Sequence, residues 1–315
     1  MGEKILVTGA SGSIGSYVTQ RLIDAGYQVT GLTRSSENAA LLESRGVTPV
    51  IGSMNDVPAL EKGLAGAFAV VHLAGWMGVA KFSSNAVEQN VHGTELLSTQ
   101  ALDAGISHIT YLSTIGVYGP LEDNATEDHL LNAKDAYGDT KRRAEEIIRR
   151  SGINHTIFRA GPVIGPDINT WTELAYDRVK GRKPIGIGDG RGTFNYTPVH
   201  NLADAIVESL TNSAAIKETF NVVGDEQITW RHFLQYYEML LGTQAIYAPA
   251  LLSIAGAHTP FLSITPEGVG TMMGTGRVFS EKVKSSLRLR FTPFHEAMLS
   301  SLSEFPEFEN TLGKL

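Results

Sequence analysis

The chain of 315 residues contains no cysteine. This absence excludes disulfide bonds, thiolate nucleophiles and metal sites built on thiolates. Basic residues are in the minority as well, because 26 lysines and arginines against 33 acidic residues leave a formal net charge of −7. An acidic chain repels nucleic acid, so we expect no nucleic-acid partner.

The sequence also lacks a long apolar run. Its most apolar late stretch, residues 248–264, is interrupted by Pro249, Gly256, His258 and Pro260 and is too short to span a bilayer. An expected strand begins already at Lys4, which leaves no room for a signal peptide. We therefore expect no membrane partner and a cytoplasmic location.

Apolar runs and helical patterns alternate through the first half of the chain. The runs typical of buried parallel strands are 4–8, 28–32, 48–51, 67–73, 108–112 and 154–158. The helical patterns between them cover 13–25, 39–44, 58–64, 86–104 and 137–150. Repeated strand–helix units of this length predict an α/β fold, a Rossmann-type doubly wound parallel sheet.

Three glycines connect the first strand to the first helix. Gly9 permits a tight turn, Gly12 lets the backbone approach a phosphate, and Gly15 lets the helix pack closely on the strand. The free N–H groups at the helix start then face an anion. This turn predicts a dinucleotide site built from Gly9, Ser11, Gly12, Ser13, Ile14 and Gly15.

The regular alternation stops after about residue 165. We expect residues 1–166 to form an NAD(P)-binding Rossmann domain whose sheet is completed by segments near 193–224. Residues 167–192 and 225–315 are punctuated by glycine and proline. They are predicted to form a small C-terminal substrate-binding lobe over the carboxyl ends of the strands, where ligands bind in such sheets.

A tyrosine and a lysine stand four residues apart at the start of the helix after the fifth strand. Tyr137 and Lys141 therefore share one helix face. Upstream, the fifth strand runs into a loop rich in hydroxyl groups that contains Ser113 and Thr114. The pair alone carries little information, but its position in the alternation makes it a candidate catalytic site.

In these features the chain resembles the extended short-chain dehydrogenase/reductase superfamily, of the NAD(P)-dependent epimerase/dehydratase type. The resemblance covers most of the chain and adds further motifs to the glycine turn and the Tyr137/Lys141 pair. These motifs are His72-Leu73-Ala74-Gly75, Asn90-Val91-His92-Gly93-Thr94, Ser113-Thr114 with Val117-Tyr118-Gly119, Arg159-Ala160-Gly161-Pro162-Val163-Ile164-Gly165-Pro166, and Val199-His200-Asn201-Leu202-Ala203-Asp204-Ala205.

The resemblance implies an enzyme that transfers hydride, with three catalytic residues. Tyr137 is the implied acid/base at a substrate hydroxyl or carbonyl, and Thr114 holds the substrate oxygen. A tyrosine pKa of about 10 must fall by about 3 units for work near pH 7, which requires roughly 4 kcal/mol. Lys141 supplies a nearby cation for that change, together with an oxidised nicotinamide ring.

The resemblance also implies cofactor contacts along the same sheet edge. The residues concerned are Ser53, Met54, Leu73, Ala74, Gly75 and Val163, with Tyr137 and Lys141 at the nicotinamide end. Family members often carry aspartate at the Ser53 position, so the contact to adenine is weaker here. No paired histidine spacing indicates a metal ion, and none is expected.

The end of the second strand bears on cofactor choice. An NAD site normally has a carboxylate there for the ribose hydroxyls. This chain has Thr33 followed by Arg34, and no acidic residue appears before Glu37. Arginine suits a 2′-phosphate, so we expect NADP, with NAD still possible if Arg34 only stacks on adenine.

Three functions fit these residues. One is net reduction of a ketone or oxidation of an alcohol, the second is epimerisation of a nucleotide sugar, and the third is cofactor binding without chemistry. An intact Thr114, Tyr137 and Lys141 argues against the third. Dehydration is disfavoured, because Ile115-Gly116 follows Thr114 where dehydratases carry an acidic pair.

The substrate itself is not determined by the sequence. Arg191, Arg231 and Arg277 are candidate partners for a sugar-nucleotide diphosphate. An apolar pocket is the alternative, with candidate lining residues Trp76, Met77, Val79, Phe82, Trp171 and 248–261. We expect a small-molecule substrate, NADP-dependent oxidoreductase activity, and a homodimer formed through the helices at 86–104 and 137–150.

Overall fold

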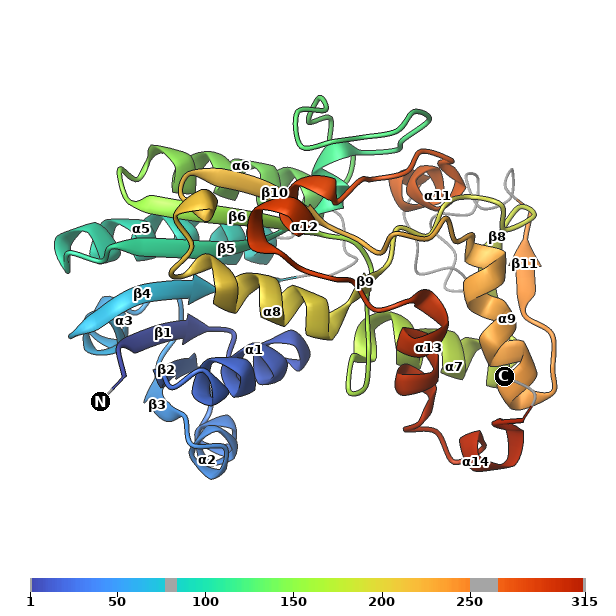
Figure 1. Ribbon diagram of the computed structural model, residues 1–315, viewed down its shortest axis with the longest axis horizontal. Helices are drawn as coiled ribbons and strands as arrows, with labels where there is room; N and C mark the ends of the chain where they lie inside the picture. Colours follow the sequence, from blue (N-terminus) through green and yellow to red (C-terminus); the bar gives the residue numbers. More distant parts are fainter. Residues whose placement is uncertain (1, 77–83, 250–265, 314–315) are drawn as a thin grey trace.

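The computed structural model describes residues 2–76, 84–249 and 266–313. Its larger body is a seven-stranded parallel sheet with helices on both faces (Figure 1). The strands are β1 (Lys4–Thr8), β2 (Gln28–Thr33), β3 (Thr48–Ile51), β4 (Ala67–His72), β5 (His108–Thr114), β6 (Asn154–Ala160) and β10 (Glu218–Val222). Their order is β10-β6-β5-β4-β1-β2-β3. The predicted Rossmann-type sheet is confirmed.

Two helical layers enclose this sheet. On one face lie α1 (Ser13–Asp24) and α8 (Val199–Ser209), which contact each other. On the other lie α3 (Val57–Leu64), α5 (Gly93–Asp103) and α6 (Ala136–Arg150). Helix α2 (Ser36–Ser44) packs beside β3 at the sheet edge. Each layer has its own apolar core against the sheet, which fixes the strand ends in space.

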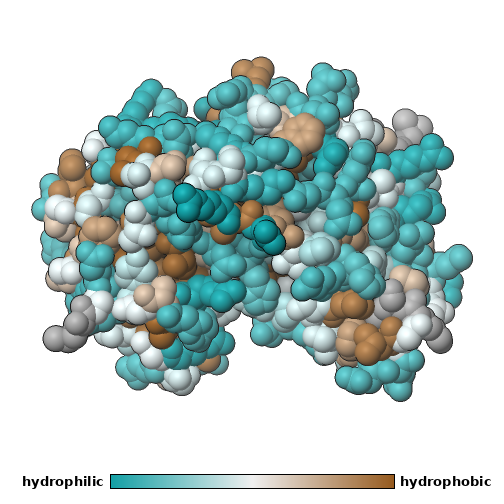
Figure 2. Space-filling view, viewed as in Figure 1, coloured by the Kyte–Doolittle hydropathy of each residue, from teal (hydrophilic) through white to brown (hydrophobic). Residues whose placement is uncertain are grey.

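A second body with its own aromatic core stands beside the sheet (Figure 1, right). Its elements are η3 (Asn169–Glu173), α7 (Leu174–Lys180), β8 (Pro184–Ile187), α9 (Trp230–Leu241), β11 (Ile246–Ala248), α11 (Pro266–Met273), α13 (Phe294–Leu302) and α14 (Phe308–Thr311). The face in Figure 2 is mostly hydrophilic, and its lower outline is indented between the two bodies. In the part of the chain that is described, no helix has the length and apolarity to cross a membrane.

The sequence prediction for residues 193–224 is only partly right. Strand β10 completes the sheet, but β9 (Thr197–Pro198) pairs instead with β7 (Val163–Ile164) in a separate short ladder. Proline lacks the N–H that a longer ladder needs; Pro162 directly precedes β7, and Pro198 is itself the last residue of β9. The chain also returns to the first body at α12 (Glu281–Leu287), whose Val283 and Leu287 join the core under α8 and β10. The prediction that assigns all of 225–315 to the lobe did not anticipate this return.

The helix predicted for residues 86–104 is present, and it contains a π-helical turn that the sequence did not indicate. It consists of α4 (Ser84–Val87), a π-helical turn η1 (Glu88–His92) and α5. Inside the π turn, the side-chain amide of Asn90 bonds both the N–H and the carbonyl of Trp76, at 2.7 and 3.0 Å. A π turn of this kind commonly marks a functional site, because it redirects one side chain. The short 3-10 helices η2 (Ile115–Tyr118) and η4 (Ser213–Ala215) complete the described elements.

Candidate active site

The carboxyl ends of β1, β4 and β5 meet where the strand order reverses. Thr8 pairs with His72, and His72 pairs with Tyr111, so the three strand ends lie side by side. The backbone then continues across this edge, since the N–H of Ala74 donates to the Thr8 hydroxyl at 3.2 Å. In parallel sheets this reversal is where ligands bind. The site residues predicted from the sequence lie in loops and helix starts that follow the strands, except Thr33 and Thr114, which end β2 and β5, and Val163, which lies in β7.

The three glycines of the β1–α1 turn do different things. Gly9 has φ of +75°, and a Cβ there would stand 2.8 Å from the backbone nitrogen of Ala74. A Cβ on Gly15 would overlap the carbonyl oxygen of Gly9, so this glycine lets α1 pack on the turn. At Gly12 an added Cβ would meet only that same oxygen, at 3.3 Å, within the described structure. Gly12 is therefore less crowded than Gly9 and Gly15, as backbone that leaves room for a phosphate should be.

The helix that follows this turn is suited to an anion. Gly12 is the N-cap of α1, no side chain caps the helix start, and its first turn holds no acidic residue. Ser11, Ser13 and Ile14 lie in the same turn, and Ile14 packs partly against the core. The uncapped N–H groups and the positive end of the helix dipole therefore point to one place.

Of the two adenosine contacts predicted at the end of β2, one is buried and the other is exposed. Thr33 is only 4% exposed, and its hydroxyl has no hydrogen-bond partner among the described residues. Arg34 is exposed, directly before the capped start of α2. A buried hydroxyl without a partner is costly unless a ligand or water meets it. The residues present therefore fit the ribose end of a dinucleotide.

The loop after β3 lies next to this position. The Ser53 hydroxyl accepts a hydrogen bond from the N–H of Asn55 at 3.2 Å. Met54 is buried against Gly93, where an added Cβ would come within 2.8 Å of it. The contact of Ser53 with adenine stays a prediction. Val163, in β7, is buried in the first core, and its cofactor contact is likewise a prediction.

The loop after β4 brings the predicted nicotinamide contacts to α6, the helix that holds the candidate catalytic residues Tyr137 and Lys141. Leu73 and Ala74 are partly buried, and Gly75 is exposed. A Cβ on Gly75 would lie 3.6 Å from the Lys141 ammonium. Asn90 holds the next residue, Trp76, and also donates to the hydroxyl of Thr140 at 3.1 Å. The loop is thus fastened to α6 beside Lys141.

Tyr137 and Lys141 lie in the first two turns of α6. Asp135 caps this helix by accepting from the N–H of Gly138 at 2.7 Å. Gly138 also abuts the loop after β5, because a Cβ there would lie 2.7 Å from the Gly116 carbonyl oxygen. The Thr114 hydroxyl accepts from the N–H of Gly116 at 3.1 Å. These contacts bring the helix start with Tyr137 against the strand end with Thr114.

Burial dominates the electrostatics of this pair. Lys141 is 3% exposed, and its ammonium lies 4.2 Å from the centre of the Tyr111 ring. Burial lowers the pKa of Lys141 to about 7, although Glu145 acts to raise it. Burial, helped by Asp135, raises the pKa of Tyr137 to about 12.

Burial, and not Lys141, is the largest cause acting on the pKa of Tyr137. The expectation that Lys141 and an oxidised nicotinamide ring together lower this pKa stays a prediction.

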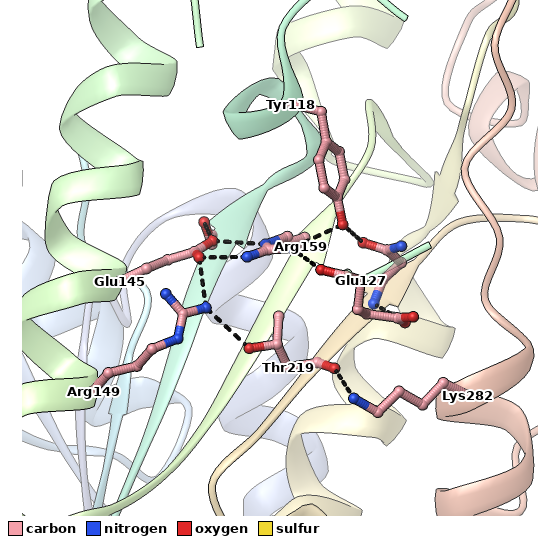
Figure 3. A network of polar contacts seen from close by, with 9 residues as sticks. Tyr118, Glu127, Glu145, Arg149, Arg159, Thr219 and Lys282 are labelled. Carbon is pink, nitrogen blue, oxygen red and sulfur yellow. Dashed lines mark hydrogen bonds and ion pairs between the residues drawn. The ribbon is translucent and has the colours of Figure 1, made fainter. Parts of the chain in front are cut away.

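Sequence reasoning missed a buried charge network directly behind these residues (Figure 3). Glu145, fully buried and one helical turn beyond Lys141, accepts two hydrogen bonds from Arg159, at 3.0 and 2.8 Å. It also accepts one from Ser113 at 2.6 Å. Arg159 reaches on to the hydroxyl of Tyr118 at 2.9 Å. The network ties α6, β5 and β6 together at the catalytic end of the sheet.

Two signals in the sequence point to this network. Glu145 shares the helix face of Tyr137 and Lys141, which makes it the next inward residue on that stripe. Arg159 directly follows residues 154–158, which are expected to form a buried strand, and a charged residue there needs a partner. His72 is the other buried titratable group here. It is fully buried between the hydroxyls of Thr8 and Thr94, and burial lowers its pKa to about 3, which leaves it neutral and structural.

A cavity opens directly beyond Thr114, between the sheet and the lobe. Among the described residues, none that lines it carries a charge: they are Ile115, Gly116, Gly119, Leu121, Pro162, Thr193, Asn195, Trp230, Gly274 and Gly276. Of the apolar residues expected at a pocket, Trp171 packs on Trp230 in the lobe core, with ring centres 5.2 Å apart. Met77, Val79, Phe82 and most of 248–261 lie outside the described residues.

The three candidate arginines for a diphosphate are engaged elsewhere. Arg191 pairs with the Asp189 carboxylate at 2.9 Å. Arg231 donates twice to the Asp189 carbonyl and lies over the Tyr247 ring. Arg277 donates to the carbonyl of Asp225 at 2.7 Å. Among the described residues, no cluster of three His, Asp or Glu side chains is placed to hold a metal ion.

Comparisons with known proteins agree with this geometry. The family model described as NAD dependent epimerase/dehydratase family matches residues 5–223. The chain is 25% identical over 268 residues to 4-hydroxy-2-methyl-3-oxo-4-farnesyl-3,4-dihydroquinoline-1-oxide ketoreductase of Stigmatella aurantiaca, a match that covers 81% of this chain and 79% of that protein.

Epimerases are similar to the same degree. N-acetyl-alpha-D-glucosaminyl-diphospho-ditrans,octacis-undecaprenol 4-epimerase of Escherichia coli O157:H7 is 25% identical over 269 residues, covering 82% of this chain and 79% of that protein. A crystal structure of UDP-glucuronic acid 4-epimerase from Bacillus cereus, in complex with UDP-glucuronic acid and NAD, superimposes with a TM-score of 0.78 at 23% identity. That superposition covers 98% of this chain and 99% of the other, and it shows a shared fold.

Proposed function

The chain belongs to the NAD dependent epimerase/dehydratase family, and on that premise we propose that it is an NADP-dependent oxidoreductase that reduces a ketone or oxidises the corresponding alcohol. The observation that carries this proposal is the uncharged cavity beside Thr114. A nucleotide sugar needs cations for its diphosphate, and the candidate arginines already have partners. An uncharged ketone needs none.

The two internal stretches outside the described residues add only one lysine and no arginine. Residues 250–265 contain neither lysine nor arginine, and 77–83 contain only Lys81. The similarity to a ketoreductase from Stigmatella aurantiaca supports the same conclusion. The second candidate function is epimerisation of a nucleotide sugar, which the equally similar undecaprenol-linked sugar epimerase favours.

In this reaction Tyr137 is the proton donor. Bound NADPH would supply the hydride to the carbonyl carbon. The phenol of Tyr137 gives its proton to the carbonyl oxygen, so that the products are an alcohol and a tyrosinate that is reprotonated from solvent. With its pKa raised to about 12, Tyr137 is protonated at neutral pH, which is the form that reduction requires at the start.

Thr114 and Lys141 position the reaction and stabilise its charge. The Thr114 hydroxyl accepts from the N–H of Gly116, which leaves its own hydrogen free to bond the substrate oxygen. Lys141, when protonated, stabilises the tyrosinate that forms. Gly75 lies close enough to Lys141 for the ammonium to reach a ribose placed in that loop.

The preference for NADP is proposed from the end of β2. Arg34 is exposed beside the orphaned hydroxyl of Thr33, and no carboxylate precedes Glu37. A guanidinium binds a 2′-phosphate with two hydrogen bonds. Thr33 lacks the carboxylate that an NAD site normally has for the ribose hydroxyls.

A direct assay tests these proposals together. The purified protein is incubated with NADPH or NADH and either a panel of aromatic and steroid ketones or a panel of UDP-, GDP- and TDP-sugars. We expect net oxidation of NADPH with a ketone, and Tyr137→Phe to abolish it while cofactor binding persists. An isomerised nucleotide sugar without net oxidation would refute the reductase, and turnover by the Tyr137→Phe variant would refute the acid/base assignment.

We also propose a homodimer formed through α5 and α6. These helices contact each other on one face of the sheet, and Leu102 near the end of α5 is 55% exposed. Burial of such a side chain in a partner interface is favourable. Light scattering on a sizing column should give twice the mass of the chain, and Leu102→Glu should reduce it. A monomer at about 50 µM would refute the proposal.

A further inference from the structure

Trp230 has an indole N–H without a hydrogen-bond partner. The residue opens α9 and is 4% exposed, with its ring against Phe194 at 4.6 Å between centres. Among the described residues, no acceptor meets its Nε1 atom. A buried indole N–H usually finds one, and leaving it unpaired costs about 1–3 kcal/mol. This donor therefore needs an acceptor from outside the described protein.

The same residue lines the cavity beside Thr114. The other polar side chains of its described wall are occupied. Thr193 donates its hydroxyl hydrogen to the carbonyl of Thr275 at 2.8 Å. Asn195 donates to the carbonyl of Gly276 at 3.2 Å and accepts from the N–H of Val278 at 2.9 Å. Asn195 keeps a second amide hydrogen, so the Trp230 indole N–H is the donor of this wall that has no partner at all among the described residues.

The opposite wall of this cavity borders the reacting groups. It is formed by Ile115 and Gly116, which directly follow Thr114. Gly138, next to Tyr137, abuts the Gly116 carbonyl oxygen. A substrate whose carbonyl lies between Thr114 and Tyr137 therefore extends through an uncharged space toward Trp230.

We propose that Trp230 determines substrate specificity, by donating its indole N–H to an oxygen acceptor that lies away from the reacting carbonyl. This inference rests on the proposed reductase function and adds a substrate class: an uncharged, largely apolar ketone with a second oxygen, in a ring ether or a further carbonyl. A site with a buried unpaired donor discriminates strongly against an analogue that lacks the acceptor.

Matched ketones separate this hydrogen bond from simple filling of the cavity. 4-Chromanone and 1-tetralone have the same bicyclic shape and differ in a ring oxygen against a methylene. Flavanone and 3-phenyl-1-tetralone form a longer pair with the same difference. The chain has three tryptophans, so protein labelled with ¹⁵N-tryptophan gives few indole signals, and Trp230→Phe assigns one of them. The spectra are recorded with NADP⁺, which cannot reduce the ketones.

We expect 4-chromanone or flavanone to move the Trp230 N–H signal downfield, and their carbocyclic partners not to. In NADPH oxidation assays, Trp230→Phe keeps a ring but loses the donor, and should raise KM for the oxygen-containing ketone about three- to tenfold. KM for the carbocyclic partner should not change. Tyr237→Phe is the control, since it removes a different buried polar group of the lobe, a hydroxyl, from a residue that is not among those lining the cavity.

The outcomes separate this proposal from the reductase function. A Trp230 signal that stays in place with all four ketones overturns the assignment, as does an equal response to both members of a pair. A selective shift without NADPH oxidation by any ketone supports the binding role of Trp230 and overturns the reductase.

Discussion

Replacing Lys141 should make the protein more stable while it destroys the activity. The lysine is buried, and burial lowers its pKa from 10.5 to about 7. At about 1.4 kcal/mol for each pKa unit, this difference corresponds to about 5 kcal/mol between the two protonation states. At pH 7 the folded protein bears about 4 kcal/mol of that penalty, because about half of the lysines are protonated there.

The substitution Lys141→Met removes this penalty and keeps an unbranched chain of similar length. It also removes the contact of the ammonium with the Tyr111 ring at 4.2 Å, which stabilises the fold by up to about 2 kcal/mol. The free energy of unfolding should therefore rise by about 2 kcal/mol at pH 7. Lys62→Met, at an exposed lysine in α3, is the matched control and should leave it unchanged.

The pH dependence gives the sharper test. Between about pH 7 and 10.5 the unfolded chain holds the Lys141 proton and the folded chain does not, so the stability of the wild type rises with pH relative to the variant. The advantage of Lys141→Met should shrink by about 2 kcal/mol from pH 7 to pH 9. Urea unfolding followed by circular dichroism, with equal m-values, measures it. An advantage that stays constant with pH, or a less stable variant, would refute the reasoning.

Three further predictions concern the glycine turn, the cofactor preference and the buried network. Gly15→Ala should destabilise the fold by about 1–3 kcal/mol, because its Cβ overlaps the Gly9 turn. Gly12→Ala should keep the melting temperature of the wild type but weaken cofactor binding in titration calorimetry. Equal melting temperatures of the two variants would contradict this. Arg34→Ser should weaken NADPH binding at least tenfold and NADH binding little, and equal losses would argue against a 2′-phosphate contact. Glu145→Gln should cost about 3–5 kcal/mol in chemical unfolding, since it leaves Arg159 buried without its carboxylate, and a loss below about 1 kcal/mol would contradict the pairing.

Local sequence patterns predicted most of the fold. The ends of the strands at Thr8 and Ile51 and of the helix at Arg150 agree with the prediction to the residue, because apolar periodicity and turn chemistry are encoded by near neighbours. The interruption at Asn90 was not predicted, since it depends on a contact with Trp76 across a loop. The prediction that residues 193–224 complete the sheet was wrong for Thr197–Pro198, where Pro162 and Pro198 give a local reason for the short separate ladder.

Part of the candidate site could likewise be predicted from the sequence, and part could not. The sequence by itself determined the glycine turn, the Thr114, Tyr137 and Lys141 set and the family resemblance, because these are short motifs with fixed spacing. Only the tertiary structure decided the charge state of that set, because burial is a property of packing.

The buried network and the cavity were also decided by the tertiary structure. Tyr118 and Asn221, 103 residues apart, join the network through a hydrogen bond of 2.7 Å. Trp230 reaches the wall beyond Thr114 only because the lobe folds back over the sheet. Contacts between residues so distant in sequence have no local pattern, since they exist only after the chain has closed around its cores.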